Sequence, residues 1–308
     1  MNAPEPVSIL SPRVFIPFLI VTMIWGATWI VIKDQLGIVP PSWSVTYRFL
    51  VAGIVMFIVA LVTRVPIAIG KRGMLFAAIF GIAQFVFNFN FVYRAEHYVT
   101  SGLVAVVFAL LFVPNALLSK AFLGQTISRP FYIGSALSII GIILLFVNEA
   151  RGDDRDIYAT LTGIGFTLAG VMSASIANVM QATQRARTLP MASILAWGML
   201  FGTIINAVFA WITVGPPVVD MRINYFLGIA YLGVIGSALA FTLYFGMIRA
   251  IGPAKAAYSS VTIPIVAMII STFAEGYHWT PLAIAGCVSA LGGLVVAFSA
   301  RKPLAKVG

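Results

Sequence analysis

Polar and aromatic side chains suited to binding a small molecule lie inside long apolar stretches of this sequence. Trp25 and Trp29, within WGATWIVIK, are four residues apart and would share one face of a helix. Gln84 and Asn88 have the same spacing in a later stretch. A polar side chain in such a helix costs free energy unless it faces protein or water, so both pairs are candidates for a cavity wall. These residue types suit noncovalent binding, since rings stack on rings and amides form hydrogen bonds.

Each pair also has a structural interpretation. Tryptophans form belts at the membrane–water interface. Counting from Val14 at 1.5 Å per residue, however, puts Trp25 about 16 Å into its helix, a depth that favours a cavity. Amides also hold neighbouring helices together, and this alternative stays open for Gln84 and Asn88.

Further candidate cavity residues are polar or aromatic side chains in other apolar stretches: Phe85, Phe108, Ser173, Asn178, Ser237, Phe241, Tyr244, Tyr258, Ser259 and Thr262. For Ser173 and Asn178, which belong to the small-residue segment AGVMSASIAN, close helix packing is the favoured alternative. The hydroxyl groups near 258–262 could instead satisfy their own backbone next to a proline.

Arg48 is the only basic residue well inside an apolar stretch, about 8 Å into its helix. Its long stem could carry the charge to the outer membrane interface, or it could pair with an outer acid such as Glu275 or Asp34. A structural role for Arg48 and Glu275 is therefore favoured over substrate contact.

The sequence offers no pattern for a metal, a cofactor or covalent chemistry. Cys287 is the single cysteine, so an intrachain disulfide is impossible. His97 and His278 are the only histidines, and both fall near expected outer loops. A membrane-embedded enzyme would need such groups clustered at one depth, and no P-loop or other nucleotide motif is present. We therefore expect no metal, no cofactor and no enzymatic activity.

The elements that must position these side chains follow from composition. Of the 308 residues 61% are hydrophobic and 9% charged, which is typical of an integral membrane protein. Lipid offers the backbone no hydrogen-bond partners, so the apolar stretches must be helices. We expect an all-α protein with ten transmembrane helices at 14–32, 43–63, 74–93, 99–119, 130–148, 157–181, 190–213, 224–248, 256–274 and 281–300.

The charges indicate an orientation. Thirteen of the 19 lysines and arginines fall in the segments on the side of the N-terminus, with a single acid, Glu5. By the positive-inside rule, both termini are predicted to be cytoplasmic. The net charge of +10 is thus explained by topology, and we expect no nucleic-acid partner.

Two prolines interrupt apolar stretches at matching places: Pro114 in FALLFVPNALL and Pro264 in YSSVTIPIVAM. Inside a helix in water, proline costs about 3 kcal/mol. Aligning the two prolines, with a one-residue insertion, also pairs Pro130 with Pro281 and Gly141 with Gly292. The sequence therefore predicts an internal duplication.

The expected repeats are 1–148 and 157–308, joined by the polar linker 149–156. With five helices each, the second repeat begins on the opposite side of the membrane, so the repeats are inverted. Secondary transporters often have this construction, with a midplane site between the halves. Bent helices free backbone carbonyls and can swing, so Pro114 and Pro264 are predicted to mark two gates.

The chain resembles the drug/metabolite transporter superfamily, in particular its ten-helix EamA-type members. The likeness rests on WGATWIVIK, on Pro41 and Arg48 before FLVAG, on YRAEHYVTSG before Pro114, and on GMIRAIGPAKAA before Pro264. It implies export of amino acids or related metabolites and a cavity lined by helices 1, 3, 4, 6, 8 and 9. It also implies that helices 5 and 10 pack together at one side. Many members have Glu where this chain has Gln125.

We therefore expect a secondary transporter that exports small metabolites, most of all neutral or aromatic amino acids. It is expected to lie among the lipids of a bacterial inner (plasma) membrane, as a monomer or weak homodimer. Every acid falls in a loop or at a helix end, with Glu275 expected to be the least exposed. Ion coupling usually uses an interior carboxylate, so a facilitator is favoured over proton-coupled drug efflux. A lipid scramblase or a scaffold remains open, and would be favoured if Trp25, Gln84 and Asn88 faced lipid.

Overall fold

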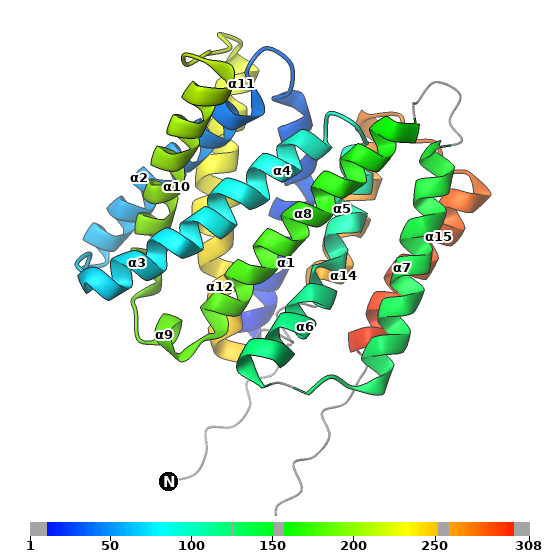
Figure 1. Cartoon of the computed structure of the whole chain (residues 1–308), viewed down its shortest axis with the longest axis horizontal. Helices are drawn as coiled ribbons and strands as arrows, with labels where there is room; N and C mark the ends of the chain where they lie inside the picture. Colours follow the sequence, from blue (N-terminus) through cyan, green and yellow to red (C-terminus); the bar gives the residue numbers. More distant parts are fainter. Residues whose placement is uncertain (1–10, 125, 151–156, 252–258, 299–308) are drawn as a thin grey trace, which may run out of the picture.

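The structure, a computed structural model, describes residues 11–124, 126–150, 157–251 and 259–298 (Figure 1). Throughout these ranges the regular elements are helices, with no strand among them. Exposed isoleucines and leucines recur along their outer faces, as at Ile54, Ile58 and Leu61 of one helix. Such an apolar exterior suits lipid rather than water.

The first half contains five helical rods. The first, second and fifth rods are the single helices α1 (Pro12–Asp34), α2 (Pro41–Val62) and α7 (Arg129–Ala150). The third rod consists of α3 (Gly70–Gly81), the π-helix η1 (Ile82–Phe87) and α4 (Asn88–Ala95). The fourth rod consists of α5 (Ser101–Phe108), the 3₁₀ turn η2 (Ala109–Leu111) and α6 (Phe112–Leu123). Proline at the first or second helical position helps α1 and α2 to begin. Gly124, at φ +66°, ends α6 in the left-handed conformation that glycine adopts without strain.

The second half has the same order of rods. The first rod is α8 (Ile157–Ala182), which the short α9 (Gln184–Arg187) follows, and the second is α10 (Met191–Val214). The third rod consists of α11 (Ile223–Ala230), the π-helix η3 (Tyr231–Leu239) and α12 (Ala240–Ile251). The fourth and fifth rods are α14 (Ser259–Ala274) and α15 (Pro281–Phe298).

Within the described residues, seven rods are long and apolar enough to cross a membrane. They span 14–34, 41–62, 70–95, 101–123, 157–182, 191–214 and 223–248. Three shorter apolar helices cover 129–145, 262–274 and 281–297. The all-helical membrane architecture expected from composition is therefore present.

Three of the rods depart from regular α-geometry near their middles. The third rod of each half contains a π-helical stretch, η1 or η3, and the sequence reasoning did not predict either one. Pro114 lies in the first turn of α6, directly after η2, and cannot donate to the carbonyl of Leu110. Pro264 lies inside α14. The irregular backbone thus lies within the bundle, where protein groups can satisfy it.

Helices α7 and α15 lie side by side at one edge of the bundle, at the right of Figure 1. A Cβ on Gly141 would lie 2.3 Å from the nitrogen of Ala290, and one on Gly293 would lie 2.4 Å from the nitrogen of Ser138. The Ser138 hydroxyl donates to the carbonyl of Ala290 over 2.9 Å. Small residues thus allow the close backbone contact that membrane helices use in place of hydrophobic association.

The remaining rods surround a common centre. Helix α2 packs along α10, and α1 packs against both α12 and α14. On the other side of the centre, α8 packs against α4, α5 and α6. Aromatic rings fill the space between, with Phe49 4.7 Å from Phe85 and 4.8 Å from Phe89 between centroids. Rods from both halves therefore enclose the region in which the candidate residues lie.

Candidate binding cavity

One cavity opens at the centre of the bundle, with about 110 Å³ of space for the centres of water-sized molecules. Since a single water needs about 10–15 Å³ on this measure, the space suits a small organic molecule. It is lined by residues of both halves: Trp25, Thr28, Trp29, Ile32, Arg48, Gln84, Asn88, Phe89, Val92, Ala105, Phe108, Ala109, Leu111, Ala174, Asn178, Phe241, Tyr244, Ser259, Ile263 and Pro264.

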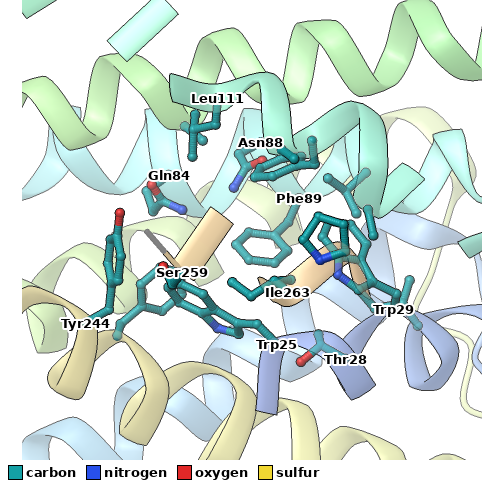
Figure 2. Close-up of a pocket in the computed structure, with 18 of the residues that line it drawn as sticks. Trp25, Thr28, Trp29, Gln84, Asn88, Phe89, Leu111, Tyr244, Ser259 and Ile263 are labelled. Carbon is teal, nitrogen blue, oxygen red and sulfur yellow. The ribbon is translucent and has the colours of Figure 1, made fainter. Parts of the chain in front are cut away.

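Aromatic rings dominate the cavity wall. The ring centroid of Trp25 lies 4.9 Å from Tyr244 and 5.4 Å from Phe241, and Trp29 lies 5.4 Å from Phe108. Figure 2 shows Trp25 and Thr28 on one side of the cavity and the amides of Gln84 and Asn88 on the other. The edges and faces of such rings can stack against a flat apolar part of a bound molecule.

Gln84 and Asn88 are buried, and neither holds two helices together in the way the structural alternative required. The amide oxygen of each lacks a hydrogen-bond partner. Helix-bridging is done instead by Asn90, whose Nδ2 donates to Asn206 Oδ1 over 2.6 Å and to Val86 O over 2.9 Å. In the sequence, Asn90 falls on a different helix face from Gln84 and Asn88. This difference in face distinguishes the amide that bridges helices from the two amides that line the cavity.

Arg48 lies in the cavity wall, and both expectations about it were wrong. Its side chain is only 1% exposed, so the charge does not reach an interface. Its Nε donates to Ser237 Oγ over 3.0 Å, and its Cζ lies 4.3 Å from the centroid of Phe89. Among the described residues it forms no salt bridge, because Glu275 accepts hydrogen bonds from Ser101 and Ser271 instead. Contacts with Ser237 and Phe89, which belong to other rods, thus hold this side chain inside the bundle.

Backbone carbonyls of both π-helical stretches accept hydrogen bonds from side chains of other rods, and in η3 one of these side chains lines the cavity. In η3, the carbonyl of Gly236 accepts from Trp25 Nε1 over 3.2 Å, next to the Ser237 hydroxyl that holds Arg48. In η1, the carbonyl of Phe85 accepts from Asn206 Nδ2 over 2.9 Å. A π-helix leaves carbonyls free for such partners and often occurs at functional sites.

Several predicted site residues lie elsewhere. Phe85 is fully buried against Phe49, Phe80 and Phe241 rather than facing the cavity. Ser237 contacts Arg48, and the Thr262 hydroxyl lies 3.1 Å from that of Thr22. Ser173 and Pro114 are also absent from the lining, where Ala174 and Leu111 are present. Tyr258 and Gln125 lie outside the described residues.

Sequence reasoning missed Thr28, Ile32, Phe89 and Val92 as lining residues. Thr28 and Ile32 continue the helical face of Trp25 and Trp29, and Val92 continues that of Gln84 and Asn88. Helical spacing alone could therefore have found three of them. Phe89 lies one residue after Asn88 and five after Gln84, so it does not share the four-residue spacing of that pair.

The most buried acid in the described residues is Glu96, so the expectation that Glu275 would be the least exposed was wrong. Glu96 follows α4 directly and is 0% exposed, and neither of its carboxylate oxygens has a hydrogen-bond partner. Burial raises the pKa of Glu96 well above its usual value, and nearby Glu275 raises it further, while Lys33 and Arg48 lower it. A buried acid that favours its neutral form is therefore present in the connection between α4 and α5.

No group of three or more His, Cys, Asp or Glu side chains comes together within the described ranges. The cavity offers groups for noncovalent recognition: aromatic rings, three amides and one guanidinium, contributed by both halves of an apolar helix bundle. These features define a helical membrane protein with a central cavity of a size that suits a small molecule.

The EamA-like transporter family matches this chain twice, at residues 14–147 and 161–299, so the chain belongs to that family. The family consists of transporters rather than enzymes. The chain is 28% identical over 261 residues to the uncharacterized inner membrane transporter YedA of Escherichia coli, covering 81% of this chain and 79% of YedA.

Two relatives from Salmonella typhimurium are more distant in sequence. Protein PagO is 22% identical over 84% of both chains. A probable amino-acid metabolite efflux pump is 22% identical over 90% of this chain and 92% of its own. One solved crystal structure matches 92% of this chain and 95% of its own at a TM-score of 0.69 and 18% identity, a likeness that concerns the fold alone.

Proposed function

We propose that this transporter exports small metabolites, most of all neutral or aromatic amino acids, across the bacterial inner membrane by alternating access. The observation that carries this substrate class is the cavity wall, in which Trp25, Trp29, Phe108 and Tyr244 surround a space of metabolite size. The relative named as a probable amino-acid metabolite efflux pump supports the same class. Stacking rings favour an apolar or aromatic body over a sugar or an ion.

In this proposal the chain forms ten spans as two inverted repeats, 1–148 and 157–308, joined by the linker 149–156, with cytoplasmic termini. Repeated packing between the halves supports the arrangement. The third rod of each half meets the second rod of the other, through Gly81 on Gly198 and Gly233 on Val51. The fourth rod of each half likewise packs against the first rod of the other, as α5 and α6 do with α8 and α14 does with α1.

The rods that contain Pro114 and Pro264 are proposed as gates. They pack against each other, since a Cβ on Gly102 of α5 would lie 2.7 Å from the sulfur of Met268 in α14. At the start of α5, the carboxylate of Glu275 accepts hydrogen bonds from the backbone and hydroxyl of Ser101. A negative charge is favourable at a helix N-terminus, so this contact would hold the two gates closed at one end of the cavity.

Glu96 favours a second candidate, proton-coupled efflux of drugs or other metabolites. The facilitator was preferred because no interior acid was expected, yet Glu96 is fully buried and lacks hydrogen-bond partners at both carboxylate oxygens. Such an acid can bind and release a proton as its surroundings change. The scramblase alternative loses its support, because Trp25, Gln84 and Asn88 face the cavity.

The test is efflux from proteoliposomes loaded with a panel of amino acids, with and without a pH gradient. We expect neutral or aromatic amino acids to leave these proteoliposomes faster than they leave protein-free liposomes. The Trp25→Ala variant should reduce the efflux rate at least about tenfold, because it removes a ring contact in the cavity wall. Trp211→Ala is the matched control, because Trp211 is 59% exposed on the apolar exterior. Equal release from protein-free vesicles for every amino acid would refute the proposal.

A further inference from the structure

The geometry points to Arg48 as the anchor for a carboxylate on the transported molecule, and to a substrate that needs no ammonium group. This inference rests on the proposed transport function and names the part of the substrate that the cavity recognises. Four observations carry it: the burial of Arg48, its unused hydrogen-bond donor, the lack of a salt bridge to it among the described residues, and the composition of the wall around it.

Arg48 is a buried cation whose charge is only partly compensated. Of its nitrogen atoms, Nε donates to Ser237, whereas Nη1 is buried with no hydrogen-bond partner. Its Cζ lies 4.3 Å from the ring centroid of Phe89 and 5.5 Å from that of Phe49, and Tyr93 and Glu96 also interact with its charge. Cation–π contacts offset only part of the cost of removing a guanidinium from water. The site therefore favours a ligand that brings a negative charge.

Arginine is the side chain best matched to a carboxylate, because its planar fork can donate two parallel hydrogen bonds. Nη1 is buried and has no hydrogen-bond partner, and Arg48 contributes to the cavity wall, so a bound carboxylate could satisfy this donor. Trp29 Nε1 is a second buried donor without a partner on the same wall. Two unused donors in one cavity define a site for an acceptor group.

The same wall holds no group that would require an ammonium. None of the described residues that line the cavity is an Asp or a Glu. The buried acid Glu96 is absent from the lining, and Glu275 is bound to Ser101 and Ser271. The amide oxygens of Gln84 and Asn88 can accept a hydrogen bond but carry no charge. A protonated amine would lose its hydration here without gaining an ion pair.

The rings complete the inferred substrate class. Trp25, Trp29, Phe108 and Tyr244 surround the space beside Arg48 with apolar surface. The cavity thus fits a small carboxylic acid with an apolar or aromatic body, of which aromatic amino acids are one kind. Small aromatic acids without an amino group belong to the same class.

Binding to the full-length protein in lipid nanodiscs tests this directly, with three probes of one shape: L-phenylalanine, phenylalaninamide and 3-phenylpropionate. The quenching of tryptophan fluorescence reports occupancy of a cavity that contains Trp25 and Trp29. We expect the two carboxylates to bind with Kd values within about fivefold of each other. The amide, which keeps the amine and loses the carboxylate, should bind at least about tenfold more weakly, as expected for a lost charged hydrogen bond.

The Arg48→Gln variant should weaken both carboxylates by about 10- to 100-fold and leave the amide unchanged, and Arg48→Lys should recover part of the loss. Arg94→Gln is the matched control, since Arg94 bonds to Asn90 and Ser42 and does not line the cavity. If Arg48→Gln does not fold, the three-probe comparison on the wild-type protein still decides.

Equal binding of acid and amide by the wild-type protein would overturn the carboxylate anchor while leaving transport of amino acids intact. Binding of none of the three probes, together with no release of any of them from liposomes, would overturn the anchor and would count against the proposed substrate class as well. Tighter binding of the amide than of 3-phenylpropionate would show that the amine, rather than the carboxylate, is recognised.

Discussion

Replacing Gly81 by alanine tests whether the close contact between the two halves sets the shape of the cavity. Gly81 is the last residue of α3, directly before η1, which carries Gln84. A Cβ at Gly81 would lie 2.3 Å from the carbonyl oxygen of Gly198 in α10, and 3.0 Å from the carbonyl carbon and Cα of Gly198. All three neighbours are backbone atoms, so no side chain can move aside.

The size of the effect follows from these distances. A carbon and an oxygen in nonbonded contact stay about 3.3–3.6 Å apart, so η1 or α10 must move by about 1 Å. Overpacking of this kind costs about 1–3 kcal/mol. Because η1 carries Gln84 into the cavity wall, the displacement should also weaken substrate binding. We expect Gly81→Ala to lower the thermal midpoint by several degrees and to reduce efflux at least about tenfold.

Thermal unfolding in detergent and efflux from liposomes measure the two effects. Gly165→Ala in α8 is the matched control, because a Cβ there meets nothing within 4 Å and alanine favours a helix. It should be at least as stable as the wild-type protein and equally active. If Gly81→Ala matched the wild-type protein in both assays, the halves would not approach each other through this glycine, and the reasoning would fail.

Two further predictions concern the gates and the buried acid. Pro264→Ala and Pro114→Ala should change the rate of efflux more than the thermal midpoint, because the prolines free carbonyls at the bends; wild-type efflux in both variants would leave them a packing role only. Because burial raises the pKa of Glu96 above the usual 4.5, the contribution of Glu96 to stability should be fully present below pH 4.5 and should be lost as pH rises through the raised pKa. In Glu96→Gln this decline should disappear, and an unchanged pH dependence in that variant would place its cause elsewhere.

Much of the fold could be predicted from the sequence because a helix is a local structure. An apolar stretch in lipid must satisfy its own backbone, so the expected ranges agree with helices such as α2 and α10 to within a few residues. The candidates on helix faces of regular spacing, Trp25 with Trp29 and Gln84 with Asn88, do lie in the cavity wall. The second pair does so although Gln84 lies within η1 and Asn88 follows it directly.

Arg48 shows what the sequence left undecided. From its position in one helix it could snorkel or pair with an acid, and the outcome depended on Ser237 and Phe89 of other rods. In the same way, Thr262 was removed from the candidates by Thr22, a residue 240 positions away. The π-helical stretches η1 and η3 were likewise not predicted from the sequence.

By itself the sequence determined that this chain is an apolar helical membrane protein, where its helices lie, and which polar residues had to face something other than lipid. Backbone hydrogen bonding and the free energy of transfer into lipid act on each segment alone, so both are readable along one chain. The tertiary structure decided which of those polar residues share the cavity, that Arg48 is buried there with an unused donor, and that Glu96 is the most deeply buried acid among the described residues. These outcomes depend on the rotation and contact of helices distant in sequence, which only packing fixes.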